Sequence, residues 1–218
     1  MILLEDNENY LLVEAKKTSK KSKKVQNIII DGKNDKKISF IEMIYIFSIC
    51  SVIGYFVEIG YVFLAVGRLV NRGLLYGPYC PIYGFGGVIL YLLFYNLKRD
   101  KRFIPYAFFV ASVVLGSFEL LCGLGFKHIF NIEMWNYSGQ FLEILNYTTV
   151  PILIGWGILG TLYVFFLQPI LIKLINFIPK SFSKRLAYII LLVFLFDLVL
   201  SIFKIINNAE ILYKLVNP

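Results

Sequence analysis

Two glutamates that lie inside long apolar stretches are the residues with the clearest capacity for chemistry. Glu58 is the only charge deep in the stretch from about 40 to 66, and Glu119 lies in the stretch from about 104 to 124. A carboxylate held in lipid costs about 3 kcal/mol even on the most lenient insertion scale, so each glutamate needs a partner. Such a group can bind a cation, accept hydrogen bonds or act as a general base.

Two arginines just beyond the first stretch are the nearest cationic partners in the sequence. At 1.5 Å per residue, Glu58 lies about 4–5 Å and Glu119 about 7–8 Å from the middle of its helix, toward the same face of the membrane. The forked side chains of Arg68 and Arg72 suit a bidentate hold on a carboxylate. We therefore predict that these four residues meet, either as a structural ion-pair network or as a pocket for a headgroup, an ion or a solute.

A stretch rich in glycine and proline follows these arginines. Residues 67–87, GRLVNRGLLYGPYCPIYGFGG, contain six glycines and two prolines. Glycine permits positive φ and proline lacks an amide donor, so this stretch is not expected to be regular helix throughout. Irregular backbone at membrane depth survives only where it is buried in protein or lines a wet cavity. The stretch is either part of a binding site or a tight turn followed by close packing at Gly84, Gly86 and Gly87.

Asp197 is a third acidic residue in an apolar stretch. It lies near the middle of the last stretch, one heptad before Lys204. The two are too far apart for a tight ion pair, because seven helical residues span about 10 Å. Asp197 could carry a proton, but a hydrogen bond to a neighbouring helix is the favoured interpretation.

The segment from Phe126 to Ser138 contains Trp135 and Tyr137. Both residue types prefer the membrane–water interface. The segment is amphipathic enough to predict a helix that lies along the outer surface.

The elements that must position these residues are long apolar helices. The chain of 218 residues is 58% hydrophobic and has a mean hydropathy of +0.72, whereas soluble domains are about 45–50% apolar. Blocks of about 20 apolar residues match the hydrocarbon thickness of a bilayer. The predicted fold class is all-α, a polytopic transmembrane bundle of about five helices. The predicted spans are about 40–66, 79–97, 104–124, 150–172 and 186–206.

The basic residues predict the orientation of the chain. Residues 1–39 form a Lys-rich tail, expected to be mostly disordered, with nine lysines between Lys16 and Lys37. With this tail inside, seventeen basic residues lie on the inner side and five on the outer side, as the positive-inside rule requires. We predict a multi-pass protein of the cell membrane with a cytoplasmic N-terminus and a short extracytoplasmic segment at 207–218. The net charge of +8 then reflects topology and does not indicate a nucleic-acid partner.

The sequence contains no pattern typical of a metal or cofactor site. Cys50, Cys80 and Cys122 lie in or beside apolar blocks without metal-binding spacing, and His128 is the only histidine. No phosphate loop of the form GxxxxGK[ST] occurs, so the chain is not expected to hydrolyse ATP by itself. The GxSxG and HExxH motifs are also absent, which leaves open whether the protein is an enzyme.

Four motifs together carry a family resemblance. They are Ser51-x-x-Gly54-x-x-x-Glu58, the run NRGLLYGPYCPIYGFG at 71–86, Glu119, and WNYS at 135–138. This combination resembles the ABC-transporter type IV permease family, the CmpB-like bacterial membrane proteins, over about residues 45–170. In the last motif the family pattern is Trp-Asp-Tyr-Ser, so Asn136 stands where the family has an acidic residue.

The resemblance implies a permease-like subunit that works with a separate ATPase. We predict a polar substrate site in the outer half of the membrane. The predicted substrate-binding residues are Glu58, Arg68, Asn71, Arg72, Tyr76, Tyr83, Glu119, Trp135 and Tyr137. The predicted inner loops, Lys98–Arg102 and about Lys173–Arg185, are short for docking a motor domain.

Two other functions stay open on these residues. One is an intramembrane enzyme that acts on lipid or cell-envelope precursors at the outer leaflet, with Glu58 or Glu119 as general base. The other is a non-catalytic assembly or signalling subunit, in which the same residues only hold the fold. A fully packed outer half without a cavity would favour the assembly subunit. The expected partners are the lipid bilayer and an ATPase subunit, and homo-oligomerisation is a further option.

Overall fold

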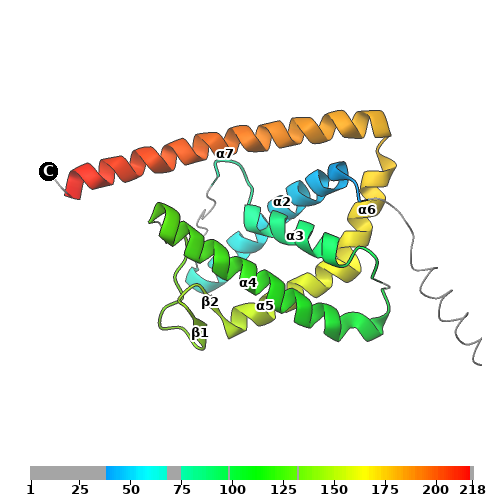
Figure 1. The fold of residues 1–218 in the computed structure, drawn as a ribbon, viewed down its shortest axis with the longest axis horizontal. Coiled ribbons are helices and arrows are strands. Elements are labelled where there is room, and N and C mark those ends of the chain that lie inside the picture. The colour runs from blue at the N-terminus through cyan, green and yellow to red at the C-terminus, as the bar shows by residue number, and fades with distance from the viewer. Residues whose placement is uncertain (1–37, 68–74, 98, 132, 217–218) are drawn as a thin grey trace, which may run out of the picture. The chain divides into compact units, whose positions relative to one another are not determined.

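The computed structural model describes residues 38–67, 75–97, 99–131 and 133–216, and these belong to one compact unit, Ile38–Pro218. The Lys-rich tail lies outside the described residues. Figure 1 shows a helical bundle in which α2 packs on α3 and α4 packs on α5. The helices are α2 (Phe40–Val66), α3 (Pro81–Leu93), α4 (Ile104–Phe130), α5 (Val150–Leu162), α6 (Gln168–Phe177) and α7 (Lys180–Val216).

Four helical segments are long and apolar enough to cross a membrane within the described residues. They are Phe40–Leu64, Lys101–Phe130, Val150–Phe177 and Lys180–Lys204. The prediction of an all-α membrane bundle is confirmed, and a helix lies over each of the five predicted spans. The second, α3, has only 13 residues, which is about 20 Å against about 30 Å of hydrocarbon. It begins at a proline in the first turn and ends before Phe94.

The segment Val150–Phe177 is one bent helix (Figure 1). The π-helical turn η2 (Tyr163–Leu167) joins α5 to α6, and Pro169 is the second residue of α6. The amide of Gln168 bonds to the carbonyl of Tyr163, and Pro169 has no amide to offer the carbonyl of Val164. Arg99 supplies the missing donor, with its Nε 3.2 Å from the Val164 oxygen.

Small residues bring α2 and α3 into close contact. A Cβ added to Gly84 would lie 2.1 Å from Ser51 Oγ, and one added to Gly87 would lie 2.6 Å from Cys50 Sγ. A Cβ added to Gly54 would lie 2.2 Å from Tyr83 Cγ. These distances support the close-packing interpretation of the glycines in α3.

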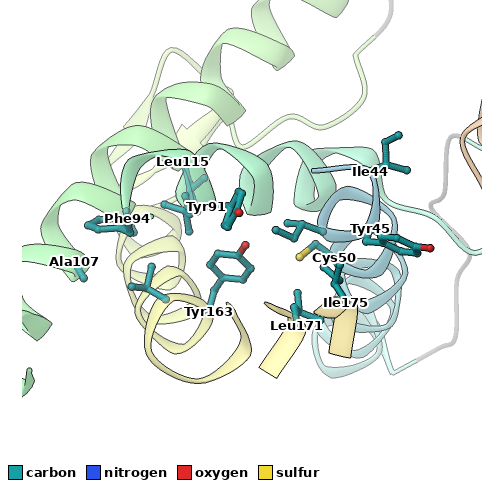
Figure 2. Packing of buried hydrophobic residues seen from close by; sticks show 14 of the residues in the cluster. Ile44, Tyr45, Cys50, Tyr91, Phe94, Ala107, Leu115, Tyr163, Leu171 and Ile175 are labelled. Carbon is teal, nitrogen blue, oxygen red and sulfur yellow. The ribbon is translucent and has the colours of Figure 1, made fainter. Parts of the chain in front are cut away.

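The buried core joins α2, α3, α4 and the bent α5–η2–α6 segment (Figure 2). The hydroxyl groups of Tyr91 and Tyr163 point toward one another in this view. Tyr91 donates a hydrogen bond to Glu42 (2.5 Å), and Tyr45 donates one to the carbonyl of Ser183 (2.9 Å). The second bond ties the first turns of α2 to the start of α7.

The predicted surface helix after α4 is wrong beyond Phe130. Helix α4 ends where Asn131 adopts a left-handed conformation (φ 54°), which asparagine tolerates better than most residues. The chain then forms turns and a short antiparallel hairpin of β1 (Glu143–Ile144) and β2 (Thr148–Thr149). Positive φ values recur at Leu142, Leu145 and Asn146. These turns could not be read from the amphipathic pattern.

Candidate functional site

Glu119 is the most enclosed carboxylate of the predicted site. It lies on α4 with 6% of its surface exposed. Its Oε2 atom accepts hydrogen bonds from Thr148 Oγ1 (3.0 Å) and Trp156 Nε1 (3.1 Å), and its Oε1 atom accepts one from Tyr137 Oη (3.4 Å). All three donors are neutral. An ionised carboxyl group only accepts hydrogen bonds, so this arrangement suits a carboxylate and offsets part of its burial cost.

Glu58 is connected to Glu119 through two aromatic side chains. Glu58 lies half-buried on α2, and its Oε2 atom accepts a hydrogen bond from Tyr83 Oη (3.2 Å). The Tyr83 ring packs against the Trp156 indole, with 5.2 Å between ring centroids. Glu58, Tyr83, Trp156 and Glu119 therefore form a continuous series of contacts. We call these four residues, with Tyr137 and Thr148, the carboxylate cluster.

Tyr137 lies in the loop after α4 and donates a hydrogen bond to Glu119. Burial raises the pKa of Tyr137, and the nearby charges of Glu119, Tyr61 and Glu58 raise it further. Because the phenol keeps its proton, it stays a hydrogen-bond donor to Glu119.

Three of the predicted site residues, Arg68, Asn71 and Arg72, lie outside the described residues, and their meeting with the glutamates stays a prediction. Within the described ranges, the ion pairs are Arg102 with Asp100 (2.7 Å) and Lys127 with Glu133 (2.9 Å). Neither involves the carboxylate cluster.

Trp135 holds its own loop in place. Its Nε1 atom donates a hydrogen bond to the carbonyl of Tyr147 (2.9 Å). The Tyr147 ring in turn packs on α4, where a Cβ added to Gly123 would lie 2.7 Å from it. Trp135 therefore supports the loop that carries Tyr137 and Thr148 to Glu119.

Tyr76 is bound to α7. Its amide donates to Asp197 Oδ1 (3.1 Å), and the next amide, of Gly77, donates to Asp197 Oδ2 (2.8 Å). Lys204 Nζ lies 4.7 Å from the centroid of the exposed Tyr76 ring, which is cation–π geometry. We call Asp197, Tyr76, Gly77 and Lys204 the α7 clamp. Asp197 thus bonds to a loop, whereas the sequence had favoured a neighbouring helix.

Two cluster residues were not predicted as site residues. Trp156 lies on α5 among the glycines Gly155, Gly157 and Gly160, a pattern that indicates close packing. A buried indole needs an acceptor for its N–H, and that requirement was the available signal. Thr148 carried no signal, because only the hairpin brings it to Glu119.

An apolar cavity of about 320 Å³ adjoins the carboxylate cluster. It lies between α2, α3 and the bent α5–η2–α6 segment, and its walls include Val57, Leu90, Leu159 and Phe166. Tyr83 and Trp156 also line it. The two aromatic residues therefore face the cavity while each bonds to one of the glutamates. Within the described residues, no group of His, Cys, Asp and Glu side chains could hold a metal ion.

These features define an α-helical integral membrane protein with a carboxylate cluster beside an apolar cavity. A family model described as "Putative ABC-transporter type IV" matches residues 45–202. The match covers well over half of the chain, and the protein belongs to this family. No curated protein and no solved structure matches the chain.

Proposed function

We propose that this protein is the membrane subunit of a transporter and that its substrate binds at the carboxylate cluster. The observation that carries this proposal is the double role of Tyr83 and Trp156. Each donates a hydrogen bond to one glutamate, and each lines the cavity. A molecule in the cavity would therefore lie next to the polar groups of the cluster.

The two glutamates are suited to different roles. Glu119 already accepts three hydrogen bonds and is almost fully buried, so it is suited to organising the site. Glu58 is half-buried and accepts a hydrogen bond from Tyr83. It is therefore better placed than Glu119 to meet a substrate. We expect Arg68, Asn71 and Arg72 to complete the site from the glycine-rich stretch, with Tyr76, Trp135 and Tyr137 at its edge.

The energy source is expected to be a separate ATPase subunit. The sequence has no phosphate loop, and the family description names an ABC transporter. With the N-terminus in the cytoplasm, the ATPase would meet the segments Lys98–Arg102 and Lys173–Arg185. The predicted extracytoplasmic C-terminus and the outer location of the cluster belong to the same proposal.

The two other functions fit these observations less well. An enzyme at the outer leaflet needs a general base that a substrate can reach, whereas Glu119 is 6% exposed and already accepts three hydrogen bonds. Only Glu58 would be left for that task. An assembly subunit needs no cavity, whereas one borders the cluster.

The experiment purifies the full-length tagged chain, after mild cross-linking, from the cells that produce it. We expect an ATP-hydrolysing subunit to co-purify and the complex to hydrolyse ATP. Glu58→Gln should lower the hydrolysis rate several-fold in an intact complex. Glu133→Gln is the matched control, because Glu133 is an exposed loop residue, and it should leave the rate unchanged. If the folded chain co-purifies with no ATPase activity, the proposal of a transporter is wrong. If Glu58→Gln leaves the rate of ATP hydrolysis unchanged, the proposed substrate site is wrong.

A further inference from the structure

We infer that the substrate class is an amphiphile whose hydrocarbon tail occupies the apolar cavity and whose polar head lies at the carboxylate cluster. The position of the head rests on the proposed function. The position of the tail rests on the cavity alone.

The cavity has the length that a lipid tail requires. Its lining residues run along the bent helix from Trp156 to Ile170, a path of about 20 Å along the helix axis. The hydrocarbon of one leaflet is about 15 Å thick, half of the full core. Deep in the cavity, Leu90 and Leu115 line it with only 2% and 4% of their surfaces exposed. A tail that fills the cavity would reach these two buried side chains.

The cavity opens sideways to the surface that faces the bilayer. Three of its lining residues, Leu162, Phe166 and Ile170, have 49%, 65% and 53% of their surfaces exposed. They lie on a helical segment that is long and apolar enough to cross the membrane. A tail can therefore enter from the surrounding hydrocarbon without crossing a polar surface, and an apolar occupant is favoured over a free polar solute.

At its head end the cavity borders the carboxylate cluster, whose glutamates accept hydrogen bonds. Tyr83 and Trp156 each present an apolar ring to the cavity and direct a polar atom to a glutamate. Carboxylates only accept hydrogen bonds, so the favoured head carries amine or hydroxyl groups. A lipid with an amine head satisfies both ends of the site.

The test uses phosphatidylethanolamine with a photoreactive diazirine near the end of one tail, as a trace component of vesicles that contain the full chain. After illumination, labelled residues are mapped by mass spectrometry. We expect label on Leu90 and Leu115, which only a tail inside the cavity can reach. Phe177, which is 90% exposed, reports ordinary contact with surrounding lipid and should be labelled in every sample.

Two tryptophan variants compare the cavity with the outer surface of the same helix. Leu159→Trp places a large ring at the cavity wall, whereas Ile158→Trp places it on the neighbouring residue, which is 52% exposed and does not line the cavity. We expect Leu159→Trp to lower the labelling of Leu90 at least five-fold and Ile158→Trp to leave it unchanged. If Leu159→Trp does not fold, the labelling of Leu90 and Leu115 in the unsubstituted chain decides the question.

The results separate this inference from the proposed function. Label confined to exposed residues such as Phe177 would overturn the amphiphile, whatever Glu58→Gln does to ATP hydrolysis. Label on Leu90 together with an unaffected Glu58→Gln complex would keep the tail in the cavity and overturn the transport site. Replacing the lipid by one with a methylated head, which lacks N–H donors, should reduce the label on Leu90. An unchanged label would overturn the assignment of the head.

Discussion

The carboxylate cluster and the α7 clamp place an acidic side chain in an apolar helix for different purposes. Glu119 accepts hydrogen bonds from three side chains of other segments. Asp197 accepts two from consecutive backbone amides, and Ser201 on its own helix adds a third at 3.4 Å. Asp197 fixes irregular backbone, which has few other ways to satisfy its amides at membrane depth. The cluster instead ends in two rings that face a cavity.

This difference shows that a charge in a membrane helix does not by itself mark a functional site. Asp197 and Glu119 are similarly buried, with 9% and 6% of their surfaces exposed. The two residues differ in where their hydrogen-bond donors lie. The donors to Asp197 belong to a loop and to α7, whereas Trp156, a donor to Glu119, also lines the cavity.

The largest effect on stability is expected at Glu119. Glu119→Ala leaves the hydroxyl groups of Thr148 and Tyr137 and the indole N–H of Trp156 without their acceptor. At about 1–3 kcal/mol for each unsatisfied buried donor, the loss should be about 3–5 kcal/mol after relaxation. Thermal unfolding of the purified protein measures this loss. The melting temperature of Glu119→Gln should lie between those of the unsubstituted protein and Glu119→Ala. A melting temperature unchanged in Glu119→Ala would contradict the network.

A smaller loss is expected at the α7 clamp. Asp197→Ala removes the acceptor of two backbone amides and should cost about 2–3 kcal/mol. The change should be local. Hydrogen exchange should accelerate at the amides of Tyr76 and Gly77, while the protection of Trp156 stays the same. Faster exchange in both regions would show that the cluster and the clamp are one unit.

The cation–π contact should contribute less again. Lys204→Met keeps the length of the side chain but removes its charge over the Tyr76 ring. We expect a loss of about 0.5–1 kcal/mol, as for other exposed contacts of this kind. Chemical unfolding measures it, and Tyr76→Leu should remove the same contribution, so that the double variant adds nothing further. Fully additive losses would show that the two side chains do not interact.

The smallest effect is a pH dependence in the loop that carries Tyr137. The hydrogen bond from Lys127, with a further one from Asn136, lowers the pKa of Glu133 below its usual value of 4.5. A lowered pKa in the folded state stabilises the protein above the ordinary pKa, and this contribution is lost as the pH falls through the lowered value. Unfolding midpoints should therefore decrease slightly below about pH 4.5, and this part should disappear in Glu133→Gln. An identical pH profile in that variant would exclude the ion pair.

Much of the bundle and the neighbourhood of the two glutamates could be predicted from the sequence. An apolar block of about 20 residues has the length of a membrane span. Hydropathy therefore locates α2, α4 and α7. Counting along α2 and α4 put Glu58 and Glu119 at nearly the same level, and in the structure Tyr83 and Trp156 link the two. The depth of a residue in the membrane follows from its position within its own helix. It can therefore be predicted from the sequence of that helix alone.

Features that depend on tertiary contacts could not be predicted. The bend at η2 needs Arg99, from another segment, to satisfy the carbonyl of Val164. Thr148 reaches Glu119 only because the hairpin turns back after β1. For Asp197 the sequence favoured a hydrogen bond to a neighbouring helix, whereas the structure pairs it with two loop amides. In each case the decisive group is distant in sequence.

The central claim is that the carboxylate cluster serves a ligand, whereas the α7 clamp serves the fold. The most direct test measures a cell phenotype of the gene's loss, divided by the amount of folded chain in the membrane, for Glu58→Gln and Asp197→Asn. We predict that this ratio falls at least ten-fold for Glu58→Gln, while Asp197→Asn reduces abundance and keeps the ratio. If the ratio for Glu58→Gln stays at the level of the unsubstituted chain, the cluster only braces the helices and the claim is wrong.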